Sequence, residues 1–160
     1  MSEHYIVAAD AGHLRIYAER VSPGQFTPGY QQVESMDFPA GKASYTDRET
    51  DMAGRFQSSK SQAGAGPGLP AGRTGMSIDE RLPMKREEGR RRARDLAAEI
   101  DSFMAQRPGA TWDFAAGPEL NNAVLEQISP PVRQRLKRSI AKDIVNQAPD
   151  HLRAHFANAR

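Results

Sequence analysis

The chain has 160 residues, of which 22 are Lys or Arg, 20 are Asp or Glu and none is Cys, so its formal net charge is +2. The absence of cysteine excludes disulfides, thiolate metal sites and cysteine nucleophiles. No apolar run approaches the roughly 18 residues of a membrane-spanning helix, and the first residues lack the basic start and apolar stretch of a secretory signal. We therefore expect a cytoplasmic protein of one domain, without a membrane partner.

The first forty residues predict three strands. Residues 5–10 form a short apolar run, typical of a strand buried on both faces. Residues 14–20 alternate apolar and polar side chains after a tight turn at Gly12, which indicates a hairpin. Residues 30–38 predict a third, more exposed strand.

A loop rich in Gly, Pro and Ser follows at about 53–75. Of the 22 residues from Gly54 to Gly75, 8 are Gly or Pro. Such a composition buries too little apolar surface to offset the entropy of ordering the chain. We expect this loop to be flexible.

The next element is a long helix, which we expect to begin with Pro83 in its first turn and to end near Gln106. Its apolar residues share one face at helical spacing; they are Ala93, Leu96, Ala97, Ile100, Phe103 and Met104. Because this stripe stops at Ala93, the arginine-rich half before it is expected to project beyond the core.

The last third of the chain predicts a strand over 111–116, a helix over 119–128, a strand over 136–145 and a helix from Pro149. The order is β-β-β-loop-α-β-α-β-α. It predicts a single α/β domain over residues 1–160, with a mixed five-stranded sheet and flanking helices.

Basic residues cluster just before and within the first half of the long helix. Lys and Arg clusters of this kind are the electrostatic footprint of nucleic-acid binding. A solvated helix face, neutralised by Glu87 and Glu88, would have the same sequence pattern. The candidate RNA-binding residues are Arg73, Lys85, Arg86, Arg90, Arg91, Arg92 and Arg94. A second basic cluster spans 133–138.

A set of polar residues forms a second candidate site, made of Asp10, Arg15, Glu49, Arg55, Lys142 and Asp143. Asp10, Asp113 and Asp143 are each expected at or near a strand end, where converging carboxylates could hold a metal ion in a nuclease. Three acidic residues at strand ends are also unremarkable in an α/β protein. No phosphate-binding glycine motif follows a strand, and we expect neither a metal nor a cofactor.

Several stretches resemble the bacterial host-attachment protein family, whose members are described as required for attachment to host cells. The matching stretches are 6–10 with 14–17, Thr46-Asp47-Arg48-Glu49, Gly72-Arg73-Thr74-Gly75 leading into the basic helix, and 125–156 with Lys142-Asp143 and Pro149-Asp150-His151-Leu152-Arg153-Ala154-His155. The resemblance covers nearly the whole chain.

The same order of elements resembles the middle domain of archaeal and eukaryotic peptide-chain release factors, an RNase H-like domain with a Gly-rich loop before a long basic helix. The chain lacks the Gly-Gly-Gln that positions water at the peptidyl ester in those factors. The resemblance therefore implies a non-catalytic protein that binds RNA or the ribosome. Two other functions stay open: an intracellular accessory protein that acts on attachment through a protein partner, and a metal-dependent nuclease.

Overall fold

The computed structural model of the protein describes residues 2–39 and 78–157. The chain divides into two compact units, Met1–Pro39 with Glu88–Arg160, and Ala40–Glu87. The predicted loop at about 53–75, and the candidate residues Glu49, Arg55 and Arg73, lie outside the described residues.

The first unit contains a mixed sheet of five strands. They are β1 (His4–Ala9), β2 (His13–Arg20), β3 (Gly29–Asp37), β4 (Thr111–Ala116) and β5 (Leu136–Ile140), in the spatial order β3-β2-β1-β4-β5. The pairs β1–β2 and β2–β3 are antiparallel, whereas β1–β4 and β4–β5 are parallel. The predicted α/β class and five-stranded mixed sheet are confirmed.

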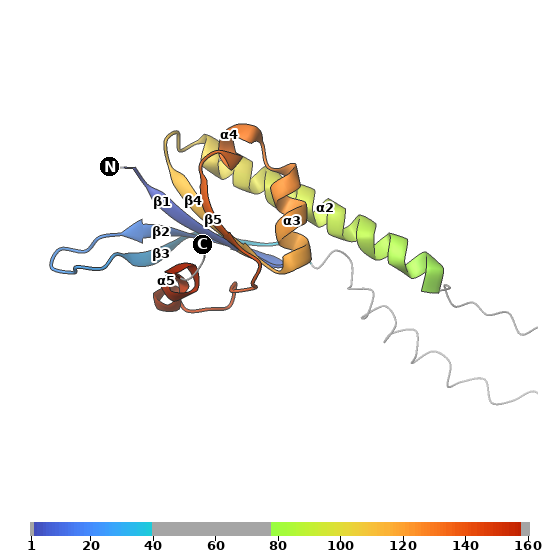
Figure 1. The fold of residues 1–160 in the computed structure, drawn as a ribbon, viewed down its shortest axis with the longest axis horizontal. Coiled ribbons are helices and arrows are strands. Elements are labelled where there is room, and N and C mark those ends of the chain that lie inside the picture. The colour runs from blue at the N-terminus through green and yellow to red at the C-terminus, as the bar shows by residue number, and fades with distance from the viewer. Residues whose placement is uncertain (1, 40–77, 158–160) are drawn as a thin grey trace, which may run out of the picture. The chain divides into compact units, whose positions relative to one another are not determined.

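Helices cover both faces of this sheet (Figure 1). They are α2 (Ile78–Ala105), α3 (Pro118–Gln127), α4 (Pro130–Arg133) and α5 (Pro149–Ala157). The part of α2 that follows Glu88 lies with α3 and α4 on one face, and α5 lies on the other. No helix within 2–39 and 78–157 is both long enough and apolar enough to cross a membrane.

The central strand β1 is buried on both faces because α2 and α5 cover its opposite sides. Tyr5, Val7 and Ala9 belong to the larger core, with α2, and Ile6 and Ala8 belong to the smaller core, with α5. This alternation is the period-two geometry of a strand. It explains why the sequence of β1 is a continuous apolar run.

The predicted core face of the long helix is confirmed. The helical residues that pack into the larger core are Ala93, Leu96, Ala97, Ile100, Phe103 and Met104. The strand residues Ile6, Val7, Ile16 and Phe114 are also buried. Val124 of α3 and Ile128, which follows the helix, are buried, whereas Leu120 and Ala123 of α3 are half-buried.

The start of the long helix was predicted wrongly. Helix α2 begins at Ile78, so Pro83 lies inside it rather than in its first turn. A proline in this position removes the hydrogen bond that its own N–H would make to the carbonyl of Asp79, and its ring crowds that carbonyl. The helix tolerates the ring so near its beginning.

The last strand is shorter than the apolar pattern predicted. Strand β5 ends at Ile140, and a carboxylate oxygen of Asp143 accepts a hydrogen bond from the backbone N–H of Val145 at 3.1 Å. This local bond stabilises a turn instead of a strand. Ile144 and Val145 are still apolar because they pack into the core beside α5.

Candidate functional site

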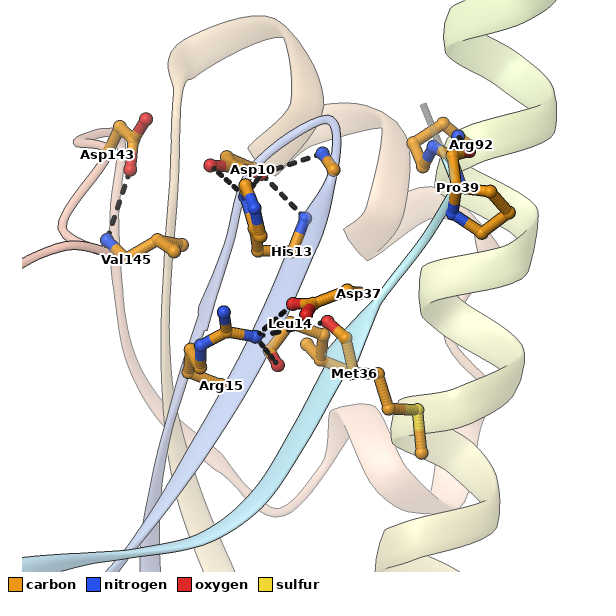
Figure 2. Close-up of polar contacts among 11 residues, drawn as sticks. Asp10, His13, Leu14, Arg15, Met36, Asp37, Pro39, Arg92, Asp143 and Val145 are labelled. Carbon is orange, nitrogen blue, oxygen red and sulfur yellow. Dashed lines mark hydrogen bonds and ion pairs between the residues drawn. The ribbon is translucent and has the colours of Figure 1, made fainter. Parts of the chain in front are cut away.

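The described residues of the predicted polar site lie at one edge of the sheet, where several strands end. Strands β1, β3, β4 and β5 run in the same direction, so their carboxyl ends share this edge. Ligands of open α/β sheets commonly bind outside the carboxyl ends of strands. Three of the predicted polar residues at this edge, Asp10, Arg15 and Asp143, are shown in Figure 2. A fourth, Lys142, comes two residues after the end of β5.

Asp10 directly follows β1 and organises the β1–β2 turn. Its Oδ1 accepts hydrogen bonds from the backbone N–H groups of Gly12 and His13, both at 2.7 Å, and lies 2.9 Å from Nδ1 of His13 (Figure 2). Burial would raise the pKa of Asp10, but the bonds from the His13 side chain and the two backbone groups outweigh it and lower the pKa. The carboxylate is thus held ionised as a turn cap.

Arg15 has different partners. Its Nη1 lies 2.8 Å from Oδ1 of Asp37, at the end of β3, and donates to the carbonyl oxygen of Met36 at 3.2 Å (Figure 2). The Asp37 side chain is 71% exposed, so this ion pair contributes little to stability. Its effect is to join the ends of β2 and β3.

The last two predicted residues lie on the connection after β5. Asp143 caps the turn at Val145, and Nζ of Lys142 is 3.4 Å from Nδ1 of His155. Within the described part of the chain, no hydrogen bond or ion pair joins Asp10 to Arg15 or to Asp143. The structure therefore gives each of the four described residues of the predicted polar site its own local contact.

Sequence reasoning missed His13 and Asp37 at this edge. His13 could have been found, because an Asp with a Gly two residues later, as in Asp10-Ala11-Gly12-His13, is typical of a turn that the Asp side chain caps. Asp37 gave no such signal, since its pairing with Arg15 depends on the β2–β3 register.

Asp113 is not at a strand end, so that prediction is wrong. It lies in the middle of β4, fully buried, with its Oδ2 2.7 Å from Nη2 of Arg138 on β5 and 3.3 Å from Nε2 of His4 on β1. Nδ1 of His4 is in turn 3.0 Å from the hydroxyl of Thr111. The structure does not bring Asp10, Asp113 and Asp143 together, and the described residues contain no group of three His, Asp or Glu able to hold a metal ion.

Most arginines of the second basic cluster are used within the fold. Arg135 donates to the carbonyl oxygens of Met104 and Arg107, and so caps the C-terminal end of α2. Arg138 pairs with Asp113 and also donates to the carbonyl oxygen of Phe156 at 2.9 Å. The cluster at 133–138 is therefore mainly structural.

The arginines of α2 divide into two groups. The guanidinium of Arg92 lies 5.0 Å from the centre of the Phe38 ring. It also donates to the carbonyl oxygen of Pro39 at 3.4 Å (Figure 2). Arg90 and Arg94, by contrast, are exposed and have no hydrogen bond or ion pair with any described residue. Of the other candidates, Arg86 is exposed too, and Lys85 and Arg91 are exposed but interact with other groups.

A comparison with known protein families identifies the family of this chain. Residues 5–156 match the model of a family described as "Protein required for attachment to host cells". No curated protein matches the chain. The matched range contains all five strands except His4, and the described helices as far as Phe156. It also contains every residue of the two predicted sites. The chain therefore belongs to the family of proteins required for attachment to host cells.

Proposed function

We propose that this protein contributes to host attachment indirectly, as a non-catalytic protein that binds RNA or the ribosome through the arginines of α2. Arg90 and Arg94, which lie four residues apart in α2, are the central contacts. A cytoplasmic location is part of this proposal.

One observation carries the proposal: the fold leaves Arg90 and Arg94 without a described partner while it uses Arg92, Arg135 and Arg138 internally. Residues four apart in a helix lie on the same side, with a rise of about 6 Å between them. Exposed guanidinium groups in such a row can each contact a phosphate.

The architecture also supports the proposal. The strand order β3-β2-β1-β4-β5, with β2 antiparallel to its neighbours, is the order expected of an RNase H-like sheet. In chain order, the next described element after β3 is the long basic helix α2. The release-factor middle domain that the sequence resembles also has a long basic helix after a loop. The missing Gly-Gly-Gln favours binding over peptidyl-tRNA hydrolysis.

The test compares the double variant Arg90→Ala/Arg94→Ala with wild type in ribosome co-sedimentation and in binding of a labelled RNA. Alanine favours the helix, so the fold should be retained. Binding through phosphates weakens steeply as the salt concentration rises. The variant should therefore bind more weakly, and its slope of log affinity against log salt should be smaller by about one for each phosphate that it no longer binds.

Two controls separate phosphate contact from net charge. The variant Arg90→Lys/Arg94→Lys keeps both charges and should retain most of the salt slope. Lys137→Ala removes one exposed charge from β5 and should leave binding unchanged. If the folded alanine variant still sediments with ribosomes like wild type at about 50 mM salt, α2 does not bind RNA. A protein captured in place of RNA would then favour the protein-partner function.

A further inference from the structure

The connection between β2 and β3 forms one wall of a surface hollow. The hollow has a volume of about 580 Å³, and α5 forms its other wall. This size is within the range of about 300–1,000 Å³ found for small-molecule sites. The side chains that line it are Gln25, Phe26, Thr27, Tyr30, Asp150 and Arg153.

Phe26 is fully exposed at this hollow. A turn sets its position: the N–H of Gln25 donates to the carbonyl oxygen of Ser22 at 3.1 Å, and Gly24 has φ of +86°. In a four-residue turn, a positive φ at the third residue favours Gly, here Gly24, and Pro is common at the second residue, here Pro23. Phe26 has a relative exposure of 104%, so its ring has no packing role in the core. Figure 1 shows the connection as the blue loop beyond β2 and β3.

The opposite side of the hollow has a second aromatic ring and a cation. Tyr30 of β3 is half-buried against the smaller core, with Arg153 of α5 near it. Burial is the main cause that raises the pKa of Tyr30; nearby Glu19 and Asp113 add to the rise, while Arg153 and Arg138 oppose it. Its hydroxyl therefore stays protonated at neutral pH and can donate a hydrogen bond.

We propose that this hollow binds an unpaired base of single-stranded RNA, with the base stacked on Phe26 and the adjoining phosphate at Arg153. The proposal rests on the RNA binding proposed above and adds a second contact point, on the β2–β3 connection. Sequence-tolerant recognition of single strands combines such aromatic platforms with cationic groups.

The mixture of lining groups favours a base over a purely apolar ligand. The side chains of Gln25 and Thr27 each offer a donor and an acceptor, and Asp150 offers an acceptor for an exocyclic amino group. A base has both a flat apolar face and a polar edge, so it would use the rings and these groups together. A proline-rich peptide would use the rings and leave most of the polar groups without partners.

The test measures binding of a labelled single-stranded RNA of about 12 nucleotides, and of a duplex of equal length, at low salt. Phe26→Ala should weaken binding of the single strand by about 5- to 150-fold, the range that removal of one stacked base gives. The duplex should be unaffected, because its bases are already stacked. Val21→Ala is the matched control, since Val21 is an exposed apolar residue (74%) on the same connection.

A Phe26→Trp variant gives a direct readout. Its indole should restore binding, and single-stranded RNA should quench its fluorescence, while buried Trp112 supplies a constant background measured in wild type. If RNA binds through Arg90 and Arg94 but Phe26→Ala binds normally and Phe26→Trp is not quenched, the base site is refuted and the proposed function stands. If wild type binds no RNA at low salt, both are refuted.

Discussion

The buried carboxylate of Asp113 makes the sharpest prediction for stability. The Asp113 side chain is 0% exposed, whereas that of Arg138 is 39% exposed. The two ends of this ion pair should therefore respond differently to substitution. Arg138→Met leaves a buried carboxylate whose other ion-pair contact among the described residues is Nε2 of His4, at 3.3 Å. Asp113→Asn leaves a cation that can turn toward water and still donates to Phe156.

The magnitudes follow from that asymmetry. Breaking a buried ion pair so that a charge stays behind costs about 3–5 kcal/mol, and the contact with His4 places Arg138→Met toward the lower end. Asp113→Asn should cost about 1–3 kcal/mol, the range for one unsatisfied polar group. The double variant Asp113→Asn/Arg138→Met should be more stable than Arg138→Met alone, because no charge then remains buried.

Urea unfolding measures these differences, with fluorescence of Trp112, the only tryptophan and a fully buried one, as the signal. Arg133→Met is the control: Arg133 is exposed and only donates to the carbonyl oxygen of Leu125, so its removal should change the free energy of unfolding by less than about 1 kcal/mol. The reasoning fails if Arg138→Met costs no more than Arg133→Met, or if the double variant is less stable than Arg138→Met.

Three further predictions use the same unfolding assay. Leu96→Ala should cost about 2–5 kcal/mol, since Leu96 is 0% exposed in the core; a cost near zero would contradict that burial. Arg92→Ala should destabilise by about 0.5–1 kcal/mol because the guanidinium no longer packs on the Phe38 ring, whereas Arg94→Ala should be neutral; equal effects would contradict the division of the arginines. Asp10→Ala should cost about 1 kcal/mol and Asp10→Asn less, because an amide oxygen can still cap the turn. Since the folded pKa of Asp10 is lowered, the stability that its ionised form adds is present above about pH 4 and is lost as the pH falls through the folded pKa; a cost of Asp10→Asn that does not shrink on acidification would contradict this.

The local sequence pattern was sufficient to predict those elements whose apolar residues pack against the core. The apolar run at 5–10 and the helical stripe from Ala93 to Met104 both report contact with the core, and both predictions are confirmed. The pattern failed at residues 141–145. Ile144 and Val145 are apolar there because they are buried, but the chain reaches the core through a turn rather than a strand.

The sequence by itself determined the α/β class, the mixed sheet and the core face of α2. Side chains that are buried at a regular spacing are apolar at that spacing, so the pattern can be read along the chain. Only the tertiary structure decided which charges are available for binding. Arg90 and Arg92 are almost adjacent and chemically identical, yet one is exposed without a described partner and the other contacts Phe38. Asp113 is buried beside Arg138 and His4, which are distant in the sequence, whereas Asp10 bonds to Gly12 and His13 in its own turn. Pairing of this kind depends on strand register and on the phase of the helix, and both are fixed by packing between segments far apart in the chain.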